Sequence, residues 1–230
     1  MLYTIANRNL SSTTGSLQNA IVSGEAVKDI NRDLTNMSFI NCNFDGKVKV
    51  GHVLAGRFIK CNFNGVNIED MSCTFRATKE TGDFDFKEHV IITSKDTPVY
   101  KIVKGQGGLY YFVYGHVPAR YTIINPIDGN QGKIRTDCFV VDKIYKLSCT
   151  SRSISIDETV TTVKSQCMGG GESIDYRKGY SIKPVKPLNC NFTVTCASGI
   201  HCFFTKEEAA DLLYELCSSY KQDKLLAVLP

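Results

Sequence analysis

The residue types best suited to chemistry lie near the C-terminus, where Cys196 is followed five positions later by His201. A thiol beside an imidazole could act as a nucleophile with its general base. Side chains alternate along a strand, so this pair would meet only if a turn at Ser198 and Gly199 folds the two together. The sequence offers no residue to orient the histidine or to bind an oxyanion. We therefore assign no catalytic residue, and Cys196 and His201 are the pair that an enzyme would use.

A structural interpretation of the same stretch accounts for more of its residues, and we favour it. Gly199 permits a tight turn, and His201 would hydrogen-bond a backbone carbonyl. Thr205 can cap a helix, with Glu208 completing a capping box. The helix that follows carries apolar residues at helical spacing on one face: Ala209, Leu212, Leu213, Leu216 and Tyr220.

Metal and phosphate sites are not indicated by the spacing of their usual residues. Cys190, Cys196, His201 and Cys202 are close in sequence, but no Cys-x-x-Cys pair occurs, and structural zinc sites usually contain one. The glycine runs 105–108 and 169–171 lack the Lys-Ser/Thr ending of a phosphate loop, which predicts ordinary turns. We expect no metal and no cofactor.

Composition narrows the function classes. The chain has 230 residues, a formal net charge of +4 and ten cysteines. Its basic residues are scattered, which does not favour nucleic-acid binding. No run of 18 apolar residues occurs, and the first residues do not resemble a secretory signal, so we expect neither a membrane span nor secretion. The cysteines are then expected to be reduced and to pack as small hydrophobic groups.

The elements that would position any site begin with a near-duplication. Residues 39–46 and 58–65 share six of eight positions at an offset of 19 residues (58 − 39). Within each copy, large apolar residues recur every five positions, which fits neither a helix nor an alternating strand. We predict stacked turns of chain, with Phe39 on Phe58, Phe44 on Phe63, and Cys42 on Cys61 as a packed thiol pair. Ile68 continues the second series.

This pattern, over about residues 34–76, resembles the pentapeptide-repeat family. The resemblance implies a short right-handed quadrilateral β-helix of about two coils, and a surface for binding or self-association. Lys49 stands where the first series should continue, and clean Ala-Asp/Asn-Leu units are missing. A β-meander with a chance duplication is the alternative. Residues 16–22, ending at Gly24, are predicted to form a short helix that caps the coil.

The periodicity changes near residue 85, so we predict two domains, 1–85 and 86–230. The second is predicted to be an antiparallel, β-rich α+β domain with a C-terminal helix. Its expected strands cover residues 89–93, 99–103, 109–116, 121–124, 138–147, 154–156, 159–163, 180–183, 192–196 and 200–204.

The end of this domain carries a second resemblance. Cys196, Gly199, Ile200, His201, Phe203, Thr205, Glu208 and Ala209 match the C-x-x-G-I-H-x-F-x-T-x-x-E-A ending of a domain found behind pentapeptide repeats in large DNA viruses and bacteriophages. Weaker pieces occur in the order that this domain uses, at residues 99–101, 117–119, 176–180 and 184. The resemblance carries no known activity, and it implies a viral or phage origin and a host-cell cytoplasm.

Three functions follow as hypotheses. The first is a non-catalytic binding or scaffold protein that self-associates, with a host protein as a further partner. The second is a protein that sequesters a host nucleotide signal in a pocket at a domain or subunit interface lined by Tyr, Arg and Lys, where the aromatic run 110–114 could stack on a base. The third is the Cys/His enzyme. The expected binding residues are Tyr110, Tyr114, Arg120, Tyr176, Arg177, Lys178 and His201.

Overall fold

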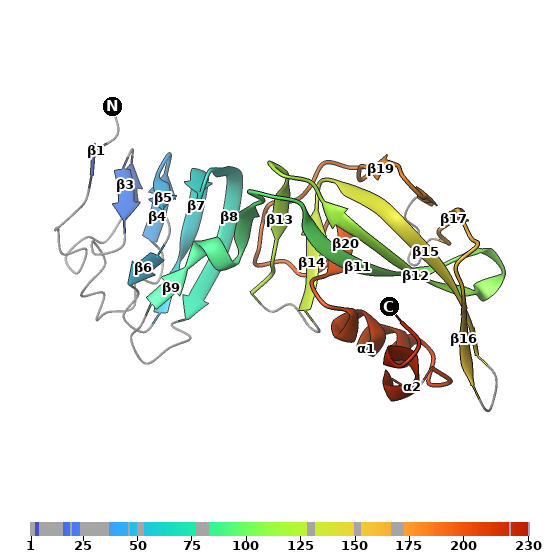
Figure 1. Cartoon of the computed structure of the whole chain (residues 1–230). Helices are drawn as coiled ribbons and strands as arrows, with labels where there is room; N and C mark the ends of the chain where they lie inside the picture. Colours follow the sequence, from blue (N-terminus) through green and yellow to red (C-terminus); the bar gives the residue numbers. More distant parts are fainter. Residues whose placement is uncertain are drawn as a thin grey trace. The chain divides into compact units, whose positions relative to one another are not determined.

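The computed structural model describes residues 3–4, 16–18, 20–23, 37–45, 47–49, 53–76, 83–127, 132–149, 153–166, 173–220 and 222–229. The fold is mainly β, with two helices at the C-terminal end (Figure 1). The chain divides into two compact units, one up to Ile91 with Cys190–Thr193 added, the other Ile92–Asn189 with Val194 onward. The sequence placed this division at residue 85 and did not anticipate that residues 190–193 belong to the first unit.

Short strands that pair in parallel build the N-terminal unit. They are β1 (Tyr3–Thr4), β2 (Ser16–Gln18), β3 (Ala20–Ser23), β4 (Met37–Ile40), β5 (Asn43–Asp45) and the longer β7 (Val53–Phe63). Strand β8 (Val66–Arg76) pairs with β7, and β6 (Lys47–Lys49) pairs with β9 (Asp83–Asp85). The order β1-β3-β5-β7-β4-β2 sets β7 beside both β5 and β4.

The predicted ring stacks are present. β4 and β7 pair in parallel with Phe39 opposite Phe58, and these rings stack at 4.9 Å with planes 5° apart. Phe44 and Phe63 stack likewise, at 4.8 Å and 5°. All four rings are buried, and Phe86 packs edge-on against Phe44 and Phe63. Five-residue spacing thus places two phenylalanines per turn in the core of this unit.

The two cysteines of the repeat are also brought together. Cys42 and Cys61 are buried, and the Cys61 thiol donates to the Phe39 carbonyl at 3.3 Å. The hydrogen bond to Cys42 and burial raise the pKa of Cys61, so this thiol stays protonated and packs as a small apolar group. Asn41 and Lys60, which precede these cysteines, have φ of 52° and 51°, the left-handed conformation of a tight corner.

Two expectations for this unit were wrong in detail. The predicted helix at 16–22 is wrong: residues 16–18 and 20–22 belong to β2 and β3, where Leu17 pairs in register with Phe39 and Val22 with Phe44. The parallel pairing therefore already involves residues that precede the obvious duplication. After Phe63 the chain reverses at Asn64 and Gly65, and β8 returns antiparallel along β7. Ile68 accordingly lies opposite Cys61 in a hairpin and is buried there.

The C-terminal unit is an antiparallel sheet. Its strands in spatial order are β13 (Thr122–Ile124), β14 (Lys133–Thr136), β20 (Ile200–Phe203), β11 (Thr97–Lys104), β12 (Tyr110–Val117), β15 (Phe139–Cys149) and β16 (Ile154–Asp157). Strand β19 (Ser181–Ile182) also pairs with β15, while β17 (Thr162–Lys164) and β18 (Asp175–Arg177) form a separate pair. Strand β10 (Val90–Ile92) lies where the chain passes from one unit to the other. Residues 192–196, expected as a strand, are irregular.

Helices α1 (Lys206–Leu216) and α2 (Gln222–Leu226) pack on one face of this sheet (Figure 1). The predicted capping box is present, with Thr205 accepting from the Glu208 amide and Glu208 accepting from the Thr205 amide. Ala209 and Leu213 are buried as predicted, whereas Leu216 ends the helix and is 36% exposed. No described helix is long and apolar enough to cross a membrane.

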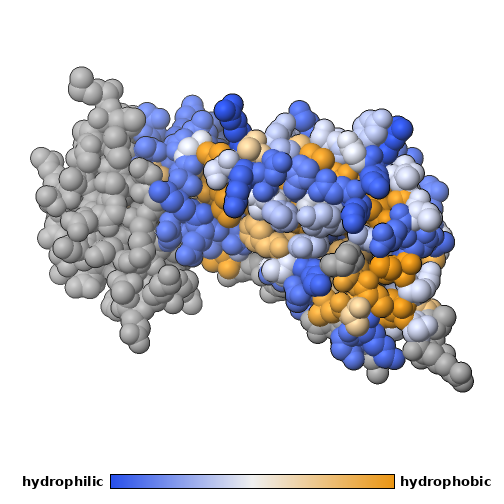
Figure 2. Space-filling model, in the orientation of Figure 1, coloured by the Kyte–Doolittle hydropathy of each residue, from blue (hydrophilic) through white to orange (hydrophobic). Residues whose placement is uncertain are grey.

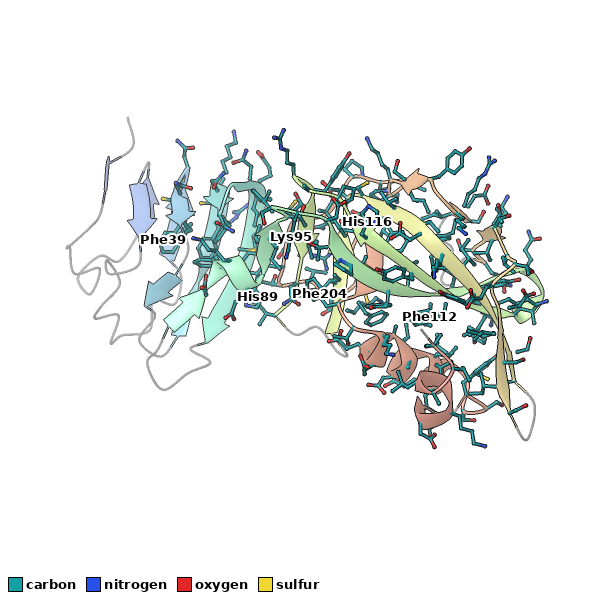
Figure 3. The ribbon with its side chains drawn as sticks, viewed as in Figure 1. Phe39, His89, Lys95, Phe112, His116 and Phe204 are labelled. Atoms are coloured by element: carbon teal, nitrogen blue, oxygen red, sulfur yellow. The ribbon has the colours of Figure 1, made fainter. Side chains whose placement is uncertain are left out.

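The side chains beneath the helices form the main core of this unit. Phe112 points from β12 toward the helices, while His116 lies farther along the same strand (Figure 3). Hydrophobic residues also gather around α2 on the surface drawn in Figure 2. The candidate site lies on the same face of the sheet and shares Phe112 and Tyr145 with this core.

Candidate functional site

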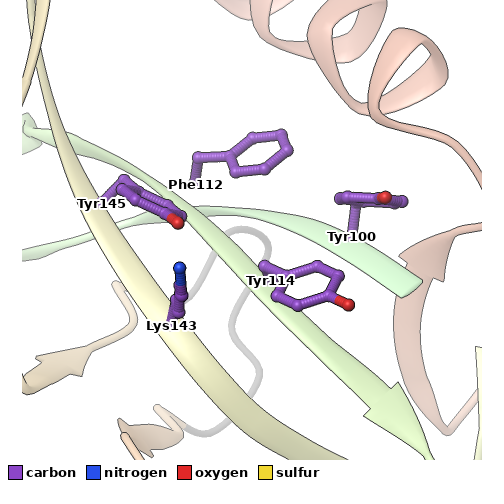
Figure 4. Close-up of a pocket in the computed structure, with 5 residues that line it drawn as sticks. All are labelled: Tyr100, Phe112, Tyr114, Lys143 and Tyr145. Atoms are coloured by element: carbon purple, nitrogen blue, oxygen red, sulfur yellow. The ribbon is translucent and has the colours of Figure 1, made fainter. Parts of the chain in front are cut away.

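Five side chains from three neighbouring strands surround a small cavity on the helix-bearing face of the sheet (Figure 4). Strand register explains why they meet. Tyr100 of β11 lies opposite Tyr114 of β12, which lies opposite Lys143 of β15. Two residues farther along both strands, Phe112 of β12 lies opposite Tyr145 of β15. Residues two apart on a strand share a face, so these five form a continuous patch.

The rings of this patch are tilted against one another. Tyr100 lies 5.5 Å from Tyr114 and 5.7 Å from Phe112, with planes tilted by 42° and 43°. Phe112 and Tyr145 lie 6.4 Å apart at 50°. In the N-terminal unit, by contrast, Phe39 stacks on Phe58 and Phe44 on Phe63 with nearly parallel planes. The tilted rings line a cavity of about 270 Å³, near the lower end of the size of small-molecule sites.

One polar atom in the wall of this cavity has no protein partner. Tyr145 is 1% exposed, and its hydroxyl is buried without a hydrogen bond. Leaving a buried hydroxyl unpaired costs about 1–3 kcal/mol, so such groups are rare and call for an explanation. In Figure 4 this hydroxyl points toward the Lys143 amine and the cavity. The hydroxyl has almost no accessible surface, so a molecule in the cavity would reach it only after a small shift of the lining side chains.

Charge is unevenly distributed around the cavity. Lys143 is exposed, and in the part of the chain described its amine forms no ion pair. Burial, followed by the nearby Tyr114 and then the Glu207 carboxylate of α1, raises the pKa of Tyr100, so this phenol remains protonated at neutral pH. The lining therefore carries one cation, Lys143, with the Glu207 carboxylate near its Tyr100 side.

A β-bulge sets the position of Lys143. The pairing of β12 with β15 shifts after Tyr114, so that Gly115 lies opposite Val141 and Asp142 is the extra residue. Asp142 accepts a hydrogen bond from His116 at 2.8 Å. Gly115 is needed here because a Cβ would lie 2.0 Å from the Val140 carbonyl oxygen.

Of the seven binding residues predicted from the sequence, Tyr114 alone lines this cavity. Tyr110 is in the core, edge-on to Tyr220, because it lies under the helices. Tyr176 is buried against Phe139. These two aromatic residues fill the interior of the unit instead of forming a binding surface.

The predicted basic residues lie elsewhere and do not converge. Arg120 is exposed in a turn with φ of 72°. Arg177 is exposed and stacks its guanidinium 4.3 Å from the ring centre of Tyr180, while Lys178 is exposed beside it. The structure therefore does not gather the expected Tyr, Arg and Lys residues in one pocket. The cavity is lined by aromatic residues and one basic residue, Lys143.

His201 and Cys196 are not joined by a hydrogen bond. The His201 Nε2 atom is buried without a partner, and the ring is hydrogen-bonded to the Ala197 carbonyl. Cys196 is exposed, with its sulfur 3.9 Å from the Lys133 amine. Burial, followed by the charges of Lys133, Lys101 and Arg135, lowers the pKa of His201 to about 3. An imidazole with this pKa is a poor general base at neutral pH, so the geometry does not support thiol catalysis.

The surroundings of His201 have a structural role. Arg135 is fully buried and donates to the carbonyls of Asn189, Val194 and Thr195, which fixes the loop before β20. Gly199 has φ of 140°, and a Cβ there would lie 2.7 Å from Leu188. The motif that suggested an enzyme thus organises a turn, a loop and a helix cap.

Lys101 is a second buried basic group in this region. Its amine donates to the His201 carbonyl at 2.6 Å and lies 5.7 Å from the centre of the Tyr176 ring. Burial, with a smaller contribution from Lys133, lowers the pKa of Lys101 to about 8. Among the described residues, no three His, Cys, Asp or Glu side chains gather as metal ligands would.

Sequence reasoning missed Tyr100, Lys143 and Tyr145. The aromatic run at 110–114 contains two of the lining residues, Phe112 and Tyr114. Its partners become visible only when β11, β12 and β15 are aligned in register, and the bulge at Asp142 shifts that alignment.

Comparison of the chain with models of known protein families, with curated proteins and with solved structures finds no match. The two family resemblances noted in the sequence therefore stay predictions.

Proposed function

We propose that this chain is a non-catalytic binding protein whose C-terminal sheet binds a small planar molecule in the cavity formed by Tyr100, Phe112, Tyr114, Lys143 and Tyr145. The observation that carries this proposal is the Tyr145 hydroxyl, which is buried and unpaired in the wall of an aromatic cavity. A molecule in the cavity would supply the missing hydrogen bond after a small shift of the lining side chains, and it would cover the partly exposed rings of Tyr100 and Tyr114. A function of this kind suits the hypothesis of a protein that sequesters a small signalling molecule.

The aromatic residues favour a flat ligand. Phenol and phenyl rings contact flat molecules through offset stacking or edge-on packing. Base–aromatic stacking contributes about 1–3 kcal/mol per ring. Polar groups then fix the orientation of the ligand, as in most small-molecule sites.

A thermal-shift screen of planar aromatic compounds tests this proposal. We expect at least one class to raise the melting temperature, because a ligand that binds only the folded state stabilises it. The shift should be lost in Tyr114→Leu, which removes one wall of the cavity. Tyr111→Leu is the matched control: Tyr111 is on the same strand, and its side chain lies on the opposite face. Equal loss in both variants, or no stabilising compound, would overturn the proposal.

A second proposed activity is self-association through the N-terminal unit. We propose that its stacked turns form a short right-handed quadrilateral β-helix, like that of pentapeptide-repeat proteins, in which the β7–β8 hairpin closes the last turn. The support is the parallel register of β2, β4 and β7 and the continuous ring stacks. In the described part of the sheet, β1 and β2 end the strand order, and exposed strand edges recruit further strands.

Light scattering tests the second activity, since a mass equal to one chain at all concentrations would remove it. The resemblance to viral and phage domains would place both activities in a host cytoplasm. Detection of the chain in the cytoplasmic fraction of infected cells would support that location, and its recovery only from particles or medium would contradict it.

A further inference from the structure

We infer that the ligand of the aromatic cavity is an anion: one aromatic ring system carrying a single phosphate or carboxylate group that pairs with Lys143. This inference rests on the binding function proposed above and adds the charge and the size of the ligand.

The sign of the charge follows from Lys143. Clusters of aromatic rings commonly bind quaternary ammonium groups, because the ring faces are negative. Here the cavity wall includes the Lys143 amine, whose charge would repel such a cation. An ammonium forms its strongest hydrogen bonds with carboxylate or phosphate oxygens. Since Lys143 has no carboxylate partner in the described chain, its charge is available to a ligand.

The order of the groups gives the shape of the ligand. Tyr100, Tyr114 and Lys143 form one row across three strands, with Lys143 at one end. Phe112 and Tyr145 form the next row, and Tyr145 lies two residues from Lys143 on the same face of β15 (Figure 4). A ring lying over Tyr100 and Tyr114 would place a substituent near Lys143 and the Tyr145 hydroxyl. Lys143 and the hydroxyl would then share the anionic group.

The volume limits the ligand to one ring system. A volume of about 270 Å³, near the lower end of small-molecule sites, matches one ring system, and a molecule with two stacked bases would extend beyond the five lining residues. Neutral phenols around the rest of the cavity are suited to an uncharged heterocycle. Nucleoside monophosphates and aromatic carboxylates are the two chemical sources of such a ligand.

Calorimetric titration tests this inference with adenosine monophosphate, adenosine, indole-3-acetate, phenyltrimethylammonium and inorganic phosphate as probes. We expect at least one anionic aromatic probe to bind tenfold or more tightly than adenosine, phenyltrimethylammonium and phosphate. Preference for adenosine monophosphate or for indole-3-acetate identifies which anionic group the site takes.

Lys143→Met should weaken binding of the anionic aromatic probe about tenfold and leave the affinity for adenosine unchanged. The preference for the anionic probe over adenosine would then be lost. Lys146→Met is the matched control on the same strand, because Lys146 pairs with Tyr111 on the opposite face, and it should leave all affinities unchanged. Lys143→Glu should reverse the preference and favour phenyltrimethylammonium.

The outcomes separate this inference from the binding function. If adenosine binds as tightly as its monophosphate, or if Lys143→Met weakens both equally, the anionic ligand is refuted while the binding site stands. If the wild-type chain prefers phenyltrimethylammonium, the sign of the charge is wrong. If no planar compound of any charge binds, the proposed function itself fails.

Discussion

Replacing Tyr145 by Phe removes one oxygen atom and little else. The Tyr145 ring is 1% exposed and packs near Phe112, so the phenyl ring of the variant keeps the same contacts. The lost hydroxyl is buried and unpaired, and an unpaired buried hydroxyl costs about 1–3 kcal/mol. We therefore expect the variant without ligand to be more stable than the wild type by about 1–3 kcal/mol. At about 2–4 °C per kcal/mol for a chain of this size, the melting temperature should rise by several degrees.

Ligand binding should change in the opposite direction. A compound that stabilises the wild-type chain should stabilise Tyr145→Phe less, because the variant cannot form the hydrogen bond to it. Differential scanning calorimetry with and without the compound measures both effects in one experiment. Tyr110→Phe is the control, since that phenol lies in the core outside the cavity and should leave the ligand-induced shift unchanged. Loss of more than about 1 kcal/mol of stability in ligand-free Tyr145→Phe would refute the reasoning, because it would show that the hydroxyl has a protein partner.

Three further substitutions test how the sheet and the stack are held. Gly115→Ala should destabilise the C-terminal unit and abolish ligand binding, because its Cβ would lie 2.0 Å from a backbone oxygen and separate β12 from β15; unchanged urea denaturation would contradict this. The pKa of His201 is about 3 in the folded chain and about 6.5 in the unfolded chain, so between these pH values the unfolded state binds more protons. The free energy of unfolding should therefore fall by about 1.4 kcal/mol per pH unit as the pH drops below 6.5. That is about 2 kcal/mol by pH 5. His201→Gln should flatten this slope in urea titrations, and an identical slope in both proteins would show that His201 is not the cause. Phe44→Ala should lower the free energy of unfolding by about 3–5 kcal/mol, since Phe44 is fully buried among Phe39, Phe58, Phe63 and Phe86. A loss below about 1 kcal/mol would mean that the stacked rings do not stabilise the N-terminal unit.

The sequence predicted well where local spacing alone determines structure. Phe39 and Phe58 stack because the same short segment recurs at a fixed offset, so register and core position repeat together. The cap at Thr205 was predictable because both of its hydrogen bonds join residues three apart. The strands of the C-terminal unit were mostly found from their β-branched and aromatic residues, although β14 and β18 were missed.

Features that depend on distant partners could not be predicted in this way. Leu17 and Val22 suit a short amphipathic helix, and they form strands because parallel pairing with Phe39 and Phe44 is available. The cavity depends on three strands meeting in one register, and on a bulge at Asp142 that no local signal marks. Lys143 therefore looks like an ordinary surface lysine in the sequence.

A crystal structure of the chain with the most stabilising compound tests the central claim most directly. The account predicts that the ring of the compound lies over Tyr100 and Tyr114, with a polar group within hydrogen-bond distance of the Tyr145 hydroxyl and an anionic group beside the Lys143 amine. A compound bound elsewhere on the chain, with the Tyr145 hydroxyl still buried and unpaired, would contradict it.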